Sequence, residues 1–242
     1  MTKIRTLIAG NWKMNGLKAD LDEIKQLEAA TAHADYDVLI CPPFTILPMC
    51  IWQFSKTTIA FGGQDCHTQK SGAFTGDISA AMLKDIGATY VIVGHSERRQ
   101  YHRETSAVVK AKAEAALAAG LTPIICVGET KEQREAGKQY DVVKEQIAAS
   151  LPDVANADFV IAYEPVWAIG TGLVASIDDI ATMHNTIRDF IEVKTTRLLY
   201  GGSVKGTNAK DILSLENVNG ALVGGASLKA KDFAEIINAA RS

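Results

Sequence analysis

Eight short apolar stretches alternate with helical patterns along the chain, and this alternation constrains its fold more than any other feature. Each stretch ends in polar residues or glycine, as buried strands do. The predicted strands are residues 6–9, 37–41, 58–62, 90–93, 123–127, 159–163, 197–200 and 221–223. Amphipathic patterns between them predict helices at residues 17–32, 106–119, 141–149, 177–193 and 231–240. Each strand with its helix takes roughly 30 residues, which matches a βα crossover unit.

Two architectures fit eight such units, a closed parallel barrel and an open doubly wound sheet. The chain has 242 residues, and a closed barrel needs about 250. No GxGxxG follows the first predicted strand, as it would in a dinucleotide-binding open sheet. No Ser/Pro-rich linker or charge block divides the chain. We therefore predict the α/β class and a (β/α)8 TIM barrel, with residues 1–242 as a single domain.

Composition argues against several classes of protein. Lys and Arg number 25 against 28 Asp and Glu, so no basic excess indicates nucleic acid as a partner. The apolar runs are too short to span a membrane, so we expect no membrane partner. The first ten residues lack a signal-peptide core, which favours the cytoplasm. The four cysteines are scattered without a CxxC pair, and no HExxH occurs, so we expect reduced core cysteines and no metal or other cofactor.

Unusual polar residues follow the first and fourth predicted strands, at the end of a barrel where active sites form. Lys13 follows the first, where its ammonium would bind an anionic substrate and stabilise developing negative charge, with Asn11 orienting it. An ordinary surface lysine is the alternative. His95 follows the fourth. Ser96 would cap a following helical turn, and a helix N-terminus there would keep His95 neutral and able to donate to a carbonyl. A purely structural histidine is the alternative.

Three charged residues follow His95, and their roles stay open at this point. Glu97 with Arg98 or Arg99 would make a simple surface ion pair.

A carboxylate followed by an apolar loop leaves the sixth predicted strand. Glu164 stands where this strand ends, which suits a catalytic base. The following loop carries Trp beside Val, Ala and Ile, and its glycines allow it to move. We interpret it as a lid made of Pro165, Val166, Trp167, Ala168, Ile169, Gly170, Thr171 and Gly172.

Paired glycines follow the seventh and eighth predicted strands, at residues 201–202 and 224–225. Barrels frequently bind a phosphate at these two strand ends, beside the start of a short extra helix. With Ser203 and Gly170, the paired glycines predict a phosphate site. A carboxylate base, a neutral histidine and a lysine beside such a site suit proton transfer α to a carbonyl on a small phosphorylated substrate. Without a redox or metal partner, we expect isomerisation through an enediolate.

Five segments in order resemble the triosephosphate isomerase family: residues 9–15, 93–99, 162–172, 200–204 and 222–228. The resemblance extends over the whole chain. It implies an aldose–ketose isomerase, an intramolecular oxidoreductase without a cofactor. The implied reaction interconverts dihydroxyacetone phosphate and D-glyceraldehyde 3-phosphate, in glycolysis and gluconeogenesis. A barrel enzyme acting on another phosphorylated sugar or heterocycle, and a non-catalytic scaffold, are the competing hypotheses.

The resemblance also implies individual roles. Glu164 would move the proton between carbons, His95 would polarise the carbonyl, and Lys13, supported by Asn11 and Glu97, would stabilise the enediolate. The implied phosphate contacts are Gly170, Ser203, Gly224 and Gly225, and Tyr200 with Ser203 would hold the closed lid.

Residues 64–79, with Gly-Ala-Phe-Thr-Gly at 72–76, resemble the interface loop of this family. This implies a homodimer in which Thr75 approaches the partner's Lys13. As a mere surface loop, the segment would leave Phe74 exposed. Two residues depart from the family pattern, Asp65 where Asn is usual and Leu173 where Lys is usual. The connection near residues 192–196 is also shorter than usual.

Overall fold

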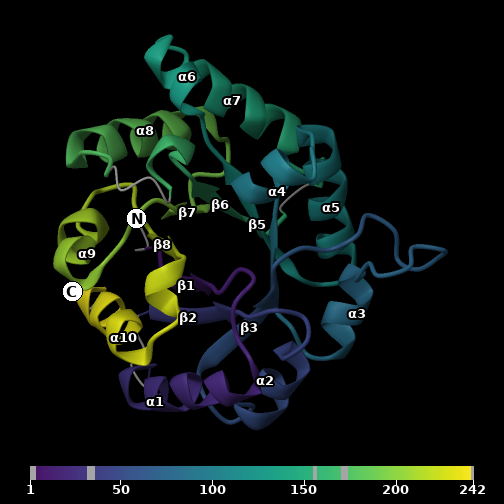
Figure 1. Ribbon diagram of the computed structural model, residues 1–242. Coiled ribbons are helices and arrows are strands. Elements are labelled where there is room, and N and C mark those ends of the chain that lie inside the picture. Colours follow the sequence, from purple (N-terminus) through teal and green to yellow (C-terminus); the bar gives the residue numbers. More distant parts are fainter. Residues whose placement is uncertain (1–3, 32–35, 155–156, 170–173, 241–242) are drawn as a thin grey trace.

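A computed structural model of the chain describes residues 4–31, 36–154, 157–169 and 174–240. Within these residues eight parallel strands run side by side in sequence order, and β8 pairs with β1 to close a barrel (Figure 1). This confirms the predicted fold. The strands are β1 Thr6–Asn11, β2 Tyr36–Cys41, β3 Ile59–Gly63, β4 Tyr90–Val93, β5 Thr122–Val127, β6 Val160–Tyr163, β7 Arg197–Tyr200 and β8 Gly220–Val223.

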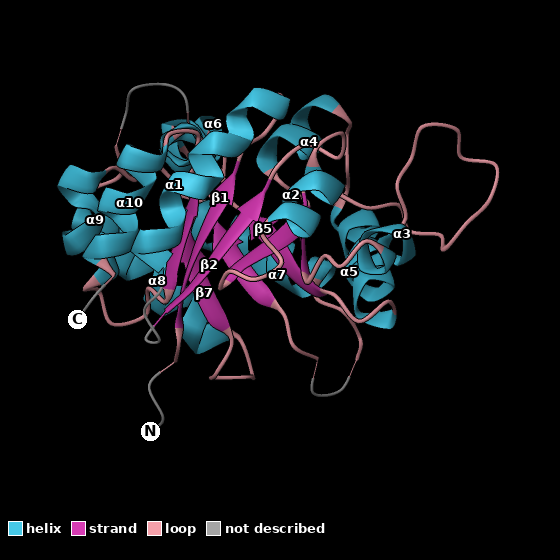
Figure 2. Cartoon of the chain, turned by 90° about the horizontal axis from the view of Figure 1, so that it is seen from below, coloured by secondary structure: helices cyan, strands magenta, loops and turns pink. Residues whose placement is uncertain are grey.

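Helices form a ring around the barrel, and the strands lie inside this ring in the perpendicular view of Figure 2. The α-helices are α1 Leu21–Thr31, α2 Leu47–Gln53, α3 Ala80–Asp85, α4 Ser96–Tyr101, α5 Ser106–Ala118, α6 Lys131–Glu135, α7 Gln139–Ser150, α8 Ile177–Phe190, α9 Gly206–Leu213 and α10 Ala230–Ala239. Short 3-10 turns lie at η1 Lys18–Asp20, η2 Val166–Ala168 and η3 Gly225–Ser227.

The alternation of side chains along each strand divides the apolar core into two layers. On β1, Leu7 and Ala9 belong to a cluster with Leu199 and Leu222, which fills the barrel. Ile8, one position along, belongs to the larger cluster between the strands and the surrounding helices. Because both faces of each strand are buried, the strands appear in the sequence as continuous apolar runs.

The long helices lie where the sequence predicts them, and most of the short helices do not appear in the prediction. The helix predicted at residues 106–119 is α5, and Thr105 caps it by accepting a hydrogen bond from the Val108 N–H. The predicted helix at residues 17–32 instead begins as η1 and becomes α1 only at Leu21. Helices such as α2 and α6 span too few residues to show a helical period, so the sequence pattern did not predict them.

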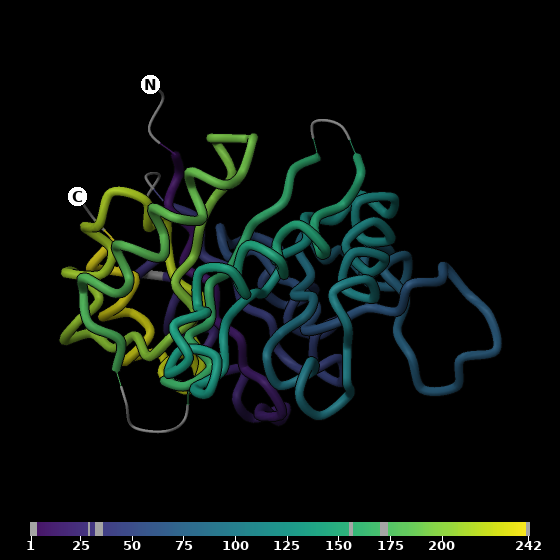
Figure 3. The backbone as a smooth tube through the Cα atoms, turned by 90° about the horizontal axis from the view of Figure 1, so that it is seen from above, coloured from purple at the N-terminus to yellow at the C-terminus, as the bar shows by residue number. Residues whose placement is uncertain are grey.

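The segment before α3 projects away from the barrel as a long loop (Figures 1 and 3). Residues 71–77 of this loop are exposed. The ring of Phe74 packs against that of His67 at a tilt of 36°, with centroids 4.1 Å apart, yet 42% of Phe74 stays exposed. In the part of the chain that the structure describes, no helix has the length and apolar character needed to cross a membrane.

Candidate active site

A cavity of about 590 Å³ opens at the carboxyl ends of the strands. It brings together predicted site residues from five different strand ends. Those that line it are Asn11, Lys13, His95, Glu97, Glu164, Ser203, Gly224 and Gly225. The described lid residues Val166, Ala168 and Ile169 form part of its wall. Residues separated by more than 200 positions therefore meet in one place because the barrel closes.

Lys13 occupies the turn after β1 with a positive φ of 53°, an unusual conformation for a residue with a side chain. Its backbone N–H donates to Oδ1 of Asn11 over 3.0 Å, so Asn11 holds the turn. Its ammonium lies 2.6 Å from a carboxylate oxygen of Glu97. The neighbour Trp12 is buried and donates to the Ser227 carbonyl, whereas Met14 is exposed.

His95 is the cap of α4, one residue earlier than the sequence suggests. Its Nδ1 accepts the Glu97 N–H at 3.2 Å, which leaves Nε2 as the ring nitrogen that can donate. Nε2 lies 2.8 Å from Oε1 of Glu164. Burial disfavours imidazolium, but the Glu164 carboxylate outweighs it and raises the pKa of His95. The helix N-terminus alone would instead lower the pKa of His95.

Glu164 is buried, and both its carboxylate oxygens have partners. Oε1 faces His95, and Oε2 accepts the backbone N–H of Ser96 at 2.9 Å. Burial alone would raise the pKa of this carboxyl group. His95 and the Ser96 N–H outweigh burial and lower the pKa of Glu164. The base is therefore held ionised in this arrangement.

The first residues of the lid are anchored by a buried carboxylate on the loop after β5. The indole N–H of Trp167 donates to Oε1 of Glu129 at 2.8 Å, and the Tyr163 hydroxyl donates to the same oxygen at 3.1 Å. The Arg134 guanidinium lies over the Trp167 ring, 4.5 Å from its centre. Burial raises the pKa of Glu129. Gly170, Thr171 and Gly172, and also Leu173, lie outside the described residues.

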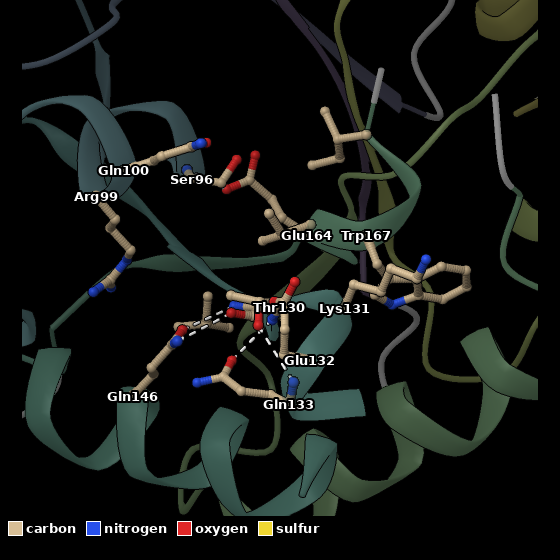
Figure 4. Close-up of a pocket in the computed structure, with 14 residues that line it drawn as sticks. Ser96, Arg99, Gln100, Thr130, Lys131, Glu132, Gln133, Gln146, Glu164 and Trp167 are labelled. Carbon is tan, nitrogen blue, oxygen red and sulfur yellow. Dashed lines mark hydrogen bonds between the residues drawn. The ribbon is translucent and has the colours of Figure 1, made fainter. Parts of the chain in front are cut away.

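A second cavity of about 620 Å³ adjoins the lid (Figure 4). Ser96 and Gln100 line one side of it, and Thr130 lies on the other. The residues that line both cavities are Ser96, Gln100, Glu164, Val166 and Ile169. The two cavities therefore meet at the carboxylate of Glu164.

The predicted phosphate glycines follow β8 and open onto the first cavity. Gly224 precedes the 3-10 turn η3, the short extra helix expected beside a phosphate. A Cβ on Gly224 would lie 3.4 Å from Cε of Lys13, so the two groups are neighbours. A Cβ on Gly225 would meet no atom within 4 Å among the described residues, so its backbone faces open space.

Tyr200 and Thr75 lie outside this cavity. Tyr200 is buried at the end of β7, and its hydroxyl has no hydrogen-bond partner among the described residues. A Cβ on Gly202 would lie 2.2 Å from that hydroxyl and 3.0 Å from Pro165. The Tyr200 hydroxyl therefore points toward the base of the lid. Thr75 lies on the exposed projecting loop.

Comparison with known proteins assigns the family. The sequence profile described as Triosephosphate isomerase matches residues 6–240. The chain belongs to the triosephosphate isomerase family. It is 56% identical to the triosephosphate isomerase of Afipia carboxidovorans over 98% of both chains, and 55% identical to that of Rhodopseudomonas palustris over 96% of both. A crystal structure of triosephosphate isomerase from Bartonella henselae superposes with a TM-score of 0.92 at 47% identity, covering 99% of this chain and 100% of that one.

The structure corrects one pairing considered for this triosephosphate isomerase family member. Neither arginine after Glu97 pairs with it. Arg98 instead binds Asp65 and Glu104. The Arg99 guanidinium donates to the carbonyls of Gly94 and Cys126 and to two serine hydroxyls.

Three residues that line or support the triosephosphate isomerase site escaped sequence reasoning. Ser96 acts through its backbone, for which the sequence carries no side-chain signal. Glu129 follows the fifth strand as Glu164 follows the sixth, so its position was a usable signal. Lys205 lines the cavity beside Ser203. Its position shortly after the paired glycines was also a usable signal. In the described part of the chain no group of three His, Cys, Asp or Glu residues could hold a metal; a cofactor-free reaction stays a prediction.

Proposed function

We propose that the cavity at the strand ends carries out the reaction of a triosephosphate isomerase, interconverting dihydroxyacetone phosphate and D-glyceraldehyde 3-phosphate. The observation that carries the proposal is the convergence of Glu164, His95 and Lys13 on one cavity beside the glycines after β8. A base, a hydrogen-bond donor and a cation at one site are the groups that an enediolate pathway needs. A glutamate base paired with a neutral histidine under a closing loop is already the established mechanism of this family.

Glu164 transfers the proton between the two carbons in this proposal. In its present position both oxygens are engaged, so it must leave His95 and Ser96 before it can reach a carbon acid. These two partners lower its pKa, whereas burial raises it. Leaving them while staying buried therefore raises the pKa and makes Glu164 a stronger base at the moment it meets the substrate.

His95 and Lys13 stabilise the charge that develops on the substrate oxygens. The Nε2–H of a neutral His95 donates to the carbonyl, since Nδ1 already accepts the Glu97 N–H. Its pKa is raised by Glu164, so departure of Glu164 favours the neutral form. The Lys13 ammonium faces the growing negative charge. Asn11 holds the backbone N–H of Lys13, and Glu97 contacts its ammonium.

The substrate phosphate binds at Ser203, Gly224 and Gly225, with Gly170 contributing from the lid. Phosphate binding drives closure of the lid, so remote binding energy assists the chemical step. The buried Tyr200 hydroxyl, which lacks a partner in the described part of the chain, is suited to bond the lid once it closes. Closure excludes water from the enediolate and protects it from losing phosphate.

We further propose that residues 1–242 act as one catalytic domain, without metal or cofactor, as a homodimer in the cytoplasm. The exposed loop around Thr75 supports the dimer, because Phe74 beside it presents apolar surface. All four cysteines are buried free thiols, which suits a reducing compartment.

The test is Glu164→Asp in a coupled assay on purified protein with a chelator and no added metal. The shorter side chain places the carboxylate about an ångström farther from the substrate carbon than in the unmodified protein. We therefore expect kcat to fall on the order of 100-fold with the fold retained. Wild-type kcat in this variant would refute Glu164 as the base. No isomerase activity in the unmodified protein would refute the proposed function itself.

A further inference from the structure

The backbone of Lys13 is held in a strained conformation at the point where its side chain enters the site. Within the described residues Lys13 and Arg103 are the non-glycine residues with positive φ. Such conformations persist only where surrounding contacts hold them. The contacts on the two sides of Lys13 therefore decide where its ammonium lies.

Two side-chain amides hold the two backbone polar groups of Lys13. Asn11 accepts its N–H, as described above. The carbonyl of Lys13 accepts a hydrogen bond of 2.8 Å from Nε2 of Gln64, one residue beyond β3. The same Nε2 donates to the carbonyl of Cys41 at 2.9 Å, so both its hydrogens are used.

Gln64 thereby joins the carboxyl ends of the first three strands. Cys41 pairs with Asn11 in the register of β1 and β2, and Gln64 follows the next strand. One amide nitrogen bridges the end of β2 to the turn after β1. This bridge lies at the backbone of Lys13, whereas Glu97 holds the other end of the same residue.

The residue after Gln64 is fixed by a ring of four charges, which are half-buried except for the buried Lys112. Asp65 contacts Lys112 at 2.7 Å and Arg98 at 2.9 Å, and Glu104 contacts the same two cations, each at 2.6 Å. Lys112 is buried. Gln64 therefore reaches Lys13 from a backbone that cannot readily shift.

We propose that Gln64 is a positioning residue for Lys13. It clamps the left-handed turn so that the ammonium faces the substrate oxygens, and it does not touch the substrate itself, since it is not among the residues that line the cavity. The inference rests on the role proposed above for Lys13.

The test compares Gln64→Met, which keeps the length of the side chain and removes both donors, with Gln53→Met. Gln53 is exposed at the end of α2 and serves as the matched control. We expect Gln64→Met to lower kcat/KM by about 10- to 100-fold and to weaken binding of glycerol phosphate in calorimetry, because a misplaced group costs rate and affinity. A merely structural role would lower Tm and leave kcat, KM and this affinity unchanged. If Gln64→Met folds poorly, Gln64→Ser, which leaves room for water, takes its place.

A double-mutant cycle with Lys13→Met decides whether Gln64 acts through Lys13. In that background Gln64→Met should change the glycerol phosphate affinity less than about twofold. An equal loss of affinity in both backgrounds, or no loss in the wild-type background, overturns the inference about Gln64 and leaves the proposed role of Lys13 in place. Wild-type activity and affinity in Lys13→Met would instead refute the proposed role of Lys13, and the inference with it.

Discussion

His184, on α8, shows how strongly burial acts on a single residue of this barrel. Its ring is fully buried, and lies edge-on to Tyr163 with centroids 6.0 Å apart. Nδ1 lies 3.0 Å from the Asn217 carbonyl, and Nε2 has no partner among the described residues. Burial lowers the pKa of His184 to about 4. The hydrogen bond to the Asn217 carbonyl favours the protonated ring, but burial outweighs it.

This shift predicts a specific loss of stability in mild acid. An unfolded histidine has a pKa of about 6.5, so the unfolded chain binds the proton first as pH falls. The stabilisation is present above that value and is lost progressively down to the folded pKa of about 4. Over this pH range the free energy of unfolding falls by on the order of 3 kcal/mol because of His184. Denaturant unfolding between pH 7.5 and 4.5, at constant protein concentration, should show a flatter pH dependence for His184→Gln. Identical slopes would contradict the assignment.

At the scale of elements, the first helix caps the last. Within α10 no side chain caps the N-terminus at Lys229. Instead Oε2 of Glu23, on α1, accepts the Ala230 N–H at 2.8 Å, and Oε1 lies 2.9 Å from the Lys229 ammonium. The Ala230 N–H and Lys229 lower the pKa of Glu23. A carboxylate thus joins the two helices that flank the closure between β1 and β8.

Removing this cap should destabilise the fold by about 1 kcal/mol near neutral pH, the usual cost of losing a helix cap. The variant is Glu23→Ala, and Glu28→Ala on the exposed face of the same helix is the control. Since the folded pKa is lowered, the stabilisation exists above the unfolded pKa and fades as pH falls. The free energy of unfolding at pH 7 and at pH 3.5 measures both effects. Equal destabilisation at the two pH values would exclude a charged cap.

Elements with a long, regular pattern were predictable, and so were the site residues that end them. The sequence predicts a strand before Glu164 and a helix from residue 106 because apolar and polar residues follow a regular pattern there. The bond from the Ser96 N–H to Glu164 joins residues 68 positions apart. Likewise Gln64 reaches Lys13 only because β1, β2 and β3 lie side by side. Such contacts depend on closure of the barrel, which no local pattern records.

At the scale of the whole molecule, the projecting loop is the part that the barrel itself does not explain. Its base is tied to the barrel by Asp65, where the family pattern has Asn. Burial raises the pKa of Asp65 in spite of its partner Lys112. Its tip is exposed and carries Phe74. Exposed apolar residues also stand beside the site, with Met14 97% and Tyr101 71% exposed. A loop firmly anchored at its base with an apolar tip is suited to dock on a second copy of this chain.

If the loop docks in this way, a long charged side chain at its tip should separate the dimer. Thr75→Arg buries an unpaired guanidinium in the proposed interface, a cost of several kcal/mol that the other contacts do not offset. Size exclusion with light scattering at micromolar concentration should then give the mass of one chain, against two for the unmodified protein. Because Thr75 is proposed to approach the partner's Lys13, kcat/KM should fall together with the mass. Ser55→Arg, on the exposed turn after α2, is the control and should change neither. An unmodified chain that already runs as a fully active monomer would refute the dimer, and a dimeric Thr75→Arg would place its interface elsewhere.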